Sequence, residues 1–262
     1  MKPLQVYIGY DPNEAVAYHV LAHSIMRRSS CPVSVTPLYR STLEGMGAFT
    51  RKRGVTESTE FSMTRFLVPW LSGYSGVSIF MDCDMLCLGD VAELADYAFS
   101  DPYKDLFCVH HLYHPTTGTK FLGQQQSVYP RKNWSSVMVF NGHRQAVRNL
   151  TPPVVSNADA SYLHQMKWAR DIGELPLEWN HLVGEYPENP EAKLVHYTLG
   201  GPYFPEYFGC EYTEHWYAEA ANALRATGDT GHLLRHVQES SSFQGESDEE
   251  PPDAKAQAGA PT

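Results

Sequence analysis

Two acidic residues, Asp82 and Asp84, have the spacing in this sequence that points most directly to chemistry. They follow the short apolar run Val77–Met81, which is typical of a buried strand, although a buried helix segment gives the same pattern. Carboxylates that follow a central strand lie where α/β proteins usually bind their ligands. Two such acids can direct oxygens at one hard cation, and a diphosphate can complete its coordination. The alternative interpretation is a pair of solvated acids in a turn.

A second alternative for a strand followed by D-x-D is a phosphatase of the haloacid dehalogenase type, in which the first Asp is the nucleophile. In those enzymes the motif opens the fold, whereas here it lies roughly a third of the way along the chain. They also need a later strand followed by an acidic pair, and Glu249 and Glu250 lie in a polar tail. The sequence therefore favours a cation-binding turn over a phosphatase.

The first element that must position a site is a strand expected at Leu4–Gly9, followed by a helix expected at Glu14–Arg28. The loop between them begins at Gly9 and offers three side chains that suit a nucleoside, those of Tyr10, Asp11 and Asn13. The aromatic ring can stack on a base, and the carboxylate or amide can hold ribose or the edge of the base. A simple turn with Asp-Pro chemistry explains the same residues equally well.

Arginines in the segment before the acidic turn are candidates for contacts with phosphate. Arg65 lies among apolar residues of a helix expected at Glu60–Trp70. Because arginine is rarely buried without a partner, Arg65 is expected to pair with a carboxylate near Asp82. The basic run Arg51–Arg53 lies in a polar segment expected to be a mobile loop, where it is either solvated or able to close over phosphates.

The C-terminal half supplies further polar candidates. A helix expected at Asp159–Arg170 carries His164 and Gln165, and a last strand expected at Lys193–His196 ends in a histidine. The loop after that strand contains Gly200 and Gly201, whose backbone amides are expected to be open. Three more histidines, at 110, 111 and 114, lie at the end of a strand expected at Leu106–His111, where a structural role is commoner than a metal cluster.

Composition indicates one large α/β domain, expected over residues 1–235, and a disordered acidic tail rich in Pro, Ser and Ala over 236–262. About half of the net charge of −10 lies in that tail, and no broad basic face for nucleic acid remains. The longest apolar runs are shorter than the ~20 residues of a membrane span, and the N-terminus lacks a signal-peptide pattern. Five cysteines without a C-x-x-C pair are typical of reduced thiols in a cytoplasmic protein.

The order of these motifs resembles that of GT-A fold glycosyltransferases, and most closely family 8, the group that contains glycogenin and bacterial lipopolysaccharide galactosyltransferases. The resemblance extends over about residues 6–204. It rests on Gly9–Asp11 after the first strand, on Thr64–Phe66, and on FMDCDML, NWSSVMVFN, LPLEWNHL and VHYTLGGPYF. It implies a Rossmann-like α/β fold with a mostly parallel central sheet flanked by helices.

The resemblance also implies roles for individual residues. Asp82, Asp84 and His196 correspond to the ligands of a divalent cation, Mn²⁺ or Mg²⁺. Arg65 corresponds to an arginine that contacts donor phosphate or braces the acidic turn. Gln165 would lie beside the anomeric carbon of the donor sugar.

His164 and Asn180 would orient the donor sugar in the same resemblance. Two features depart from the family pattern. His164 stands where the family has an acid, and the lysine after the late histidine is absent, so the amides of Gly200 and Gly201 or the basic run would have to replace its phosphate contact.

The expected function is therefore a metal-dependent hexosyltransferase of class EC 2.4. It would move a sugar from a nucleotide-sugar donor, UDP-linked by analogy, to a glycan, lipid-linked or small-molecule acceptor. Retention of the anomeric configuration is expected because the residue aligned near the anomeric carbon, Gln165, cannot act as a base. The alternative from another class is a catalytically idle relative that binds nucleotide sugar or glycan.

Overall fold

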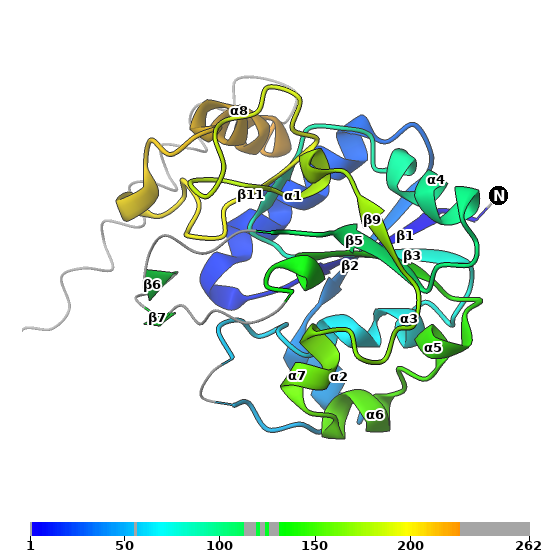
Figure 1. Cartoon of the computed structure of the whole chain (residues 1–262). Helices are drawn as coiled ribbons and strands as arrows, with labels where there is room; N and C mark the ends of the chain where they lie inside the picture. Colours follow the sequence, from blue (N-terminus) through cyan, green and yellow to red (C-terminus); the bar gives the residue numbers. More distant parts are fainter. Residues whose placement is uncertain (1, 55–56, 113–118, 121–123, 126–130, 226–262) are drawn as a thin grey trace, which may run out of the picture. The chain divides into compact units, whose positions relative to one another are not determined.

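The apolar runs of the sequence pair into a six-stranded sheet with the order β2-β1-β3-β8-β5-β9 (Figure 1). Five strands run in one direction, and β8 is antiparallel to its neighbours β3 and β5. The predicted mostly parallel sheet is therefore confirmed. The six strands are β1 (Leu4–Gly9), β2 (Val33–Leu38), β3 (Val77–Met81), β5 (Leu106–Val109), β8 (Val137–Asn141) and β9 (Ile172–Leu175).

This architecture belongs to a computed structural model that describes residues 2–54, 57–112, 119–120, 124–125 and 131–225. The chain divides into a compact unit, Met1–Ala223, and a second unit, Leu224–Thr262. The predicted boundary between residues 235 and 236 and the predicted tail lie outside the described residues, as does His114.

Two smaller sheets accompany the central one. A three-stranded sheet has the order β10-β11-β4, with β10 at His181–Leu182, β11 at Leu194–His196 and β4 at Met85–Cys87. A two-stranded sheet pairs β6 (Thr119–Lys120) with β7 (Gln124–Gln125). Because β4 begins directly after Asp84, the three-stranded sheet is joined to the acidic turn by the chain itself.

Helices flank the central sheet on both sides, as predicted. In Figure 1, α1 and α4 lie on one side of it, whereas α2, α3, α5, α6 and α7 lie on the other. None of the helices in the described part of the chain is long and apolar enough to cross a membrane. The α-helices are α1 (Ala15–Arg28), α2 (Arg40–Gly45), α3 (Val68–Leu71), α4 (Ala92–Ser100), α5 (Gln145–Arg148), α6 (Pro152–Asn157), α7 (Ala160–His164) and α8 (Thr213–Ala223). The 3-10 helices are η1 (Pro12–Glu14), η2 (Thr64–Leu67), η4 (Trp134–Ser136), η5 (Leu177–Asn180) and η6 (Pro205–Tyr207).

The central strands β3 and β8 are covered on both faces, which explains their unbroken apolar sequences. Ile79, Phe80 and Met81 of β3 are fully buried, and so are Val139 and Phe140 of β8. This packing gives the residues that follow β3 a rigid base.

Several predicted elements are shorter or differently built than expected. The helix expected at Glu60–Trp70 is η2 followed by α3, and the strand expected at Leu106–His111 ends at Val109. The helix expected at Asp159–Arg170 is confined to α7, because Gln165 caps it and Met166 takes a left-handed conformation with φ of 52° that ends it. The segment expected to be a mobile loop, Ser41–Ser58, has its first residues in α2 instead. Arg40, the first residue of α2, donates to Glu44 at 2.7 Å and so closes the i, i+4 pair of a helix turn.

Candidate active site

The polar candidates of the sequence gather at one edge of the central sheet. Asp11 follows β1, Asp82 follows β3 and His110 follows β5, and these three strands run in the same direction. The antiparallel strand β8 starts at this edge, so Ser136 lies beside Asp82, whose amide donates to the Ser136 carbonyl oxygen at 3.0 Å. The carboxyl edge of such a sheet is where α/β proteins bind their ligands.

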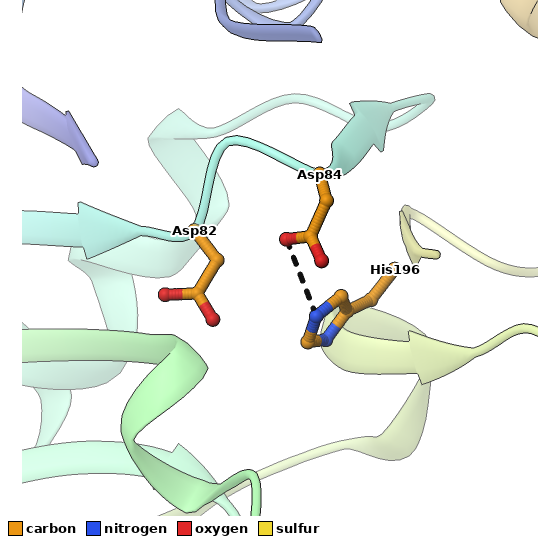
Figure 2. A group of neighbouring side chains, drawn as sticks. All are labelled: Asp82, Asp84 and His196. Carbon is orange, nitrogen blue, oxygen red and sulfur yellow. Dashed lines mark ion pairs between the residues drawn. The ribbon is translucent and has the colours of Figure 1, made fainter. Parts of the chain in front are cut away.

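Asp82, Asp84 and His196 converge at this edge and each offers one ligand atom within 4.8 Å of the others. Figure 2 shows both acids on the turn after β3 and the imidazole reaching them from the end of β11. Asp84 Oδ1 lies 3.4 Å from His196 Nε2. Two carboxylates and one imidazole form a ligand set that divalent cations such as Mn²⁺ accept.

Strand pairing brings His196 to the acidic turn. Strand β11 is antiparallel to β4, with His196 opposite Met85, and the next amide, that of Tyr197, donates to the Asp84 carbonyl oxygen at 2.9 Å. The backbone of the turn that carries Asp82 and Asp84 therefore fixes the position of His196.

A buried amide sets the tautomer of His196. Asn180 is fully buried, and its Nδ2 donates to the Asn133 carbonyl oxygen at 3.2 Å, so its Oδ1 faces His196. Oδ1 lies 2.8 Å from His196 Nδ1 and, as an oxygen acceptor, requires the proton on Nδ1. In the neutral ring, Nε2 then carries the lone pair on the side of Asp84, which is the arrangement of a metal-ligating histidine.

Arg65 braces Asp82, as the sequence predicted. Its Nη1 lies 2.8 Å from Asp82 Oδ1 and donates to the Ser135 carbonyl oxygen at 2.9 Å, and both side chains are nearly buried. Burial raises the pKa of Asp82 to about 6, with Arg65 opposing the rise and Asp84 adding to it. Since a cation would favour the charged carboxylate, it would act in the same direction as Arg65.

The acidic oxygens fit a cation. Asp82 Oδ1 and Asp84 Oδ1 are buried and accept no hydrogen bond within the described chain, since Arg65 approaches the former without hydrogen-bond geometry. Buried polar atoms normally have partners. A cation held by Asp82, Asp84 and His196 would supply the partner that these two oxygens lack.

The sequence analysis missed a third acid beside this cluster. Glu14, the last residue of η1, is 3% exposed and accepts a hydrogen bond from Tyr203 Oη at 2.6 Å. Burial raises the pKa of Glu14 to about 8, and the charge of Asp84 adds to the rise, so the carboxyl is protonated at neutral pH. The available signal was its place one turn after Asp11, at the same edge as the D-x-D.

The loop after β1 uses its polar groups internally. Asp11 Oδ1 accepts from the backbone and side-chain nitrogens of Asn13 at 3.0 and 2.9 Å, and its Oδ2 accepts from the Glu60 amide at 3.2 Å. Tyr10 packs edge-on against two other tyrosine rings, at 18 and 39. A Cβ at Gly9 would lie 2.3 Å from the Phe61 ring, so packing alone requires this glycine. Contact of the loop with a nucleoside stays a prediction.

His164 belongs to the hydrogen-bond network of the cluster. Its Nδ1 lies 3.1 Å from Ser135 Oγ, and Ser135 is the residue whose carbonyl accepts from Arg65. The next residue, Gln165, accepts from Arg131 Nη1 through its carbonyl oxygen at 2.6 Å. The structure thus brings the α7 terminus close to Arg65, whereas the place of the Gln165 side chain beside a donor sugar stays a prediction.

The groups expected to hold phosphate are largely engaged. The Gly200 amide donates to the Tyr197 carbonyl oxygen at 2.8 Å. The prediction that this amide is open is therefore wrong. A Cβ at Gly200 or Gly201 would lie 2.2 or 2.3 Å from a tyrosine ring, which explains both glycines by packing.

The basic run is engaged as well. Arg51 donates to the Ala158 carbonyl oxygen at 2.5 Å and pairs with Glu57, and Arg53 pairs with Glu60. The expectation that these arginines close over phosphates therefore requires them to leave their present partners.

The histidines after β5 have neighbours of their own. His110 stacks on Trp134 with ring centroids 3.9 Å apart, and His111 Nδ1 lies 3.1 Å from Tyr186 Oη. Burial lowers the pKa of His111 to about 3, and the charge of His196 contributes. Both rings follow the end of β5 and therefore lie at the edge of the sheet that carries Asp82.

No protein-family model matches the chain. It is 44% identical over 225 residues to protein CDI of Arabidopsis thaliana, an alignment that spans 83% of this chain and 86% of that protein. The chain belongs to the protein CDI family. The extent of the match means that the CDI family shares most of the compact unit, including the segment with the acidic turn.

Solved structures show which fold this CDI family member has. WbbM, a bifunctional glycosyltransferase, gives a TM-score of 0.58 at 15% identity, over 89% of this chain and 51% of WbbM. The glycosyltransferase GlyE of Streptococcus pneumoniae TIGR4 gives 0.56 at 11%, over 92% and 64%. The galactosyltransferase LgtC, solved with donor and acceptor sugar analogues, gives 0.52 at 12%, over 88% and 99%.

These likenesses show a shared GT-A fold, as the sequence predicted. The chain spans only about half of WbbM and under two thirds of GlyE. In the structure the D-x-D follows β3, the third strand along the chain, and so does not open the fold as it does in phosphatases of the haloacid dehalogenase type.

Proposed function

We propose that this chain is a metal-dependent glycosyltransferase that moves a sugar from a nucleotide-sugar donor to an acceptor hydroxyl. The observation that carries the proposal is the convergence of Asp82, Asp84 and His196 at the carboxyl edge of a GT-A sheet. A UDP-linked donor and relation to family 8 are proposed from the resemblance of the motifs.

The residues of the cluster would hold Mn²⁺ or Mg²⁺, which when bound would stabilise the negative charge of the departing diphosphate. Arg65 keeps Asp82 in place and ionised, because its guanidinium lies 2.8 Å from Oδ1. Asn180 holds the His196 ring so that Nε2 faces the acids. Burial and the charge of Asp84 raise the pKa of Glu14 to about 8, so before a cation binds this carboxyl adds no third negative charge beside Asp82 and Asp84.

The reaction is proposed to proceed with retention. The bond between the anomeric carbon and the diphosphate oxygen breaks, and the acceptor oxygen bonds to that carbon from the same face. The acceptor proton passes to the leaving diphosphate oxygen. Gln165 is proposed to stabilise the oxocarbenium character of the sugar, and His164 to orient the sugar from its hydrogen bond to Ser135.

One observation favours a second candidate, a nucleotide-sugar or glycan-binding protein without catalysis. The lysine that binds phosphate in glycosyltransferase family 8 is absent from this sequence. The Gly200 amide and the guanidinium groups of Arg51 and Arg53 have other partners. Fewer contacts to the diphosphate would reduce stabilisation of the leaving group while leaving the cation site intact.

Calorimetry with UDP, with and without Mn²⁺, followed by hydrolysis assays on UDP-glucose and UDP-galactose, tests the proposal. We expect Mn²⁺-dependent UDP binding and donor hydrolysis. Asp82→Asn and Asp84→Asn should abolish both, whereas Asp96→Asn, the same change at an exposed site on α4, should not. Metal-dependent binding without hydrolysis or transfer would support the non-catalytic candidate, and full activity of either ligand variant would refute the metal site.

A further inference from the structure

A cavity of about 510 Å³ lies at the carboxyl ends of β5 and β9. Small-molecule sites commonly measure about 300–1,000 Å³, so the cavity can hold a small ligand. Val109 and Leu175, which form the last aligned pair of β5 and β9, line it together with Pro176 and Leu177. The cavity is therefore built on the rigid sheet and on the turn that follows it.

The cavity lies at the same edge of the sheet as the metal ligands. Only β8 separates β5 from β3, the strand that precedes Asp82, so the two strand ends are about 10 Å apart at the usual spacing of 4.7–4.9 Å. Tyr186 lines the cavity and contacts His111 at 3.1 Å, and His111 is close enough to His196 to feel its charge. A ligand in the cavity would therefore lie next to the proposed reaction centre.

The chemistry of the cavity differs from that of a diphosphate site. No lysine or arginine is among the described residues that line it, and Glu174 adds a negative charge. His110 Nδ1 lies 3.8 Å from Glu174 Oε2, and the two side chains are 22% and 70% exposed, so a ligand in the cavity can reach both. Burial lowers the pKa of His110, so the ring is neutral at pH 7 and can accept from a hydroxyl.

Apolar and aromatic walls surround this polar pair. Tyr97 and Tyr186 contribute rings, and Leu177, which is 42% exposed, stands where a ligand can reach it. A sugar ring has C–H groups on its faces and hydroxyl groups around its edge, so it can pack on such walls and hydrogen-bond to a histidine and a carboxylate at once. An apolar substituent on the sugar would pack against the remaining apolar residues that line the cavity.

We propose that this cavity is the acceptor subsite of the transferase and that it binds a neutral glycoside, a sugar ring with an apolar substituent. The role of acceptor subsite rests on the proposed transferase function. The binding of a glycoside to the cavity can be tested without any catalysis.

Saturation-transfer NMR on the full chain tests it with phenyl β-glucoside, phenyl β-galactoside and phenyl β-xyloside, each beside phenol alone. We expect at least one glycoside to bind, phenol not to bind, and UDP with Mn²⁺ not to displace the glycoside. Leu177→Trp, which fills the cavity, should weaken binding by about ten-fold or more. Met26→Trp, the same residue introduced at an exposed position on α1, should leave it unchanged.

Binding that survives in Leu177→Trp, displacement by UDP, equal binding of phenol, or binding of none of the three glycosides would each overturn the inference. Glu174→Gln gives a second test. Because the Glu174 side chain is exposed, this substitution should not affect folding, yet it should weaken the binding of the glycoside. Donor hydrolysis needs no acceptor, so its presence without glycoside binding would refute the subsite alone. Glycoside binding without donor hydrolysis would refute the transferase and leave a glycan-binding cavity.

Discussion

Replacing Asn180 tests whether a buried amide controls the metal affinity of the site. In Asn180→Leu, the proton on His196 Nδ1 loses its acceptor at 2.8 Å in a fully buried environment. The ring is then free to place its proton on Nε2, the nitrogen that faces Asp84 at 3.4 Å, and this tautomer cannot ligate a cation.

The size of the effect follows from the burial. A buried donor left without a partner costs about 1–3 kcal/mol, which corresponds to roughly 5- to 150-fold in an equilibrium constant. Loss of a partner behind a metal-ligating histidine typically lowers metal affinity by about 10- to 100-fold, in agreement with that range. We therefore expect Mn²⁺ to bind Asn180→Leu about 10- to 100-fold more weakly than the unchanged chain.

Electron paramagnetic resonance of free Mn²⁺ during titration of the full chain measures this affinity directly. Asn180→Asp is the matched control, because its carboxylate can still accept from His196 Nδ1 but cannot donate to the Asn133 carbonyl. It should keep or exceed the original affinity. Unchanged Mn²⁺ affinity in a folded Asn180→Leu variant, with only the KM for donor raised, would refute the reasoning and return Asn180 to the role of a sugar-orienting residue.

Three further predictions concern stability. Arg65→Met leaves Asp82 buried without its guanidinium partner and should lower the free energy of urea unfolding by about 3–5 kcal/mol at pH 8. The loss should be smaller at pH 5, where Asp82 takes up a proton. An equal loss at both pH values would contradict the pairing. Because the pKa of Glu14 is raised from 4.5 to about 8, ionisation in the folded state costs stability, so stability should fall as pH rises from about 4.5 to about 8. Glu14→Gln should lessen this fall in melting temperature measured with EDTA, and an unaltered pH profile would show that Glu14 is not held protonated. Gly9→Ala should destabilise by about 1–3 kcal/mol through its contact with the Phe61 ring, and Phe61→Leu should recover part of the loss unless Gly9 serves a ligand instead.

Local sequence was sufficient for the acidic turn and its support. An unbroken apolar run that ends in two acids predicts a buried strand with a site at its end, and β3 with Asp82 and Asp84 has that form. An arginine among apolar residues predicts a buried ion pair, because an unpaired guanidinium is too costly to bury, and Arg65 pairs with Asp82. Both predictions rest on the cost of burying charge, which depends on residue type and not on distant pairing.

The ends of elements were predicted less well. The helix expected over Asp159–Arg170 ends at His164, and the turn is made by Met166 at positive φ, a residue with no sequence signal for that conformation. Packing of the surrounding segments determines where this helix ends, because a non-glycine residue adopts positive φ only where its surroundings hold it there.

Tertiary structure alone decided what surrounds Asp82, Asp84 and His196. Burial raises the pKa of Glu14, and the charges of Asp84 and Asp82, which lie about 70 residues away in the sequence, add to the rise, so no short window of sequence contains that arrangement. Asn180 reaches His196 because η5 follows β9 at the edge where β11 pairs with β4. The sequence named the residue types that can bind a cation, whereas the register between strands far apart in the chain determined which atoms face it and which proton each carries.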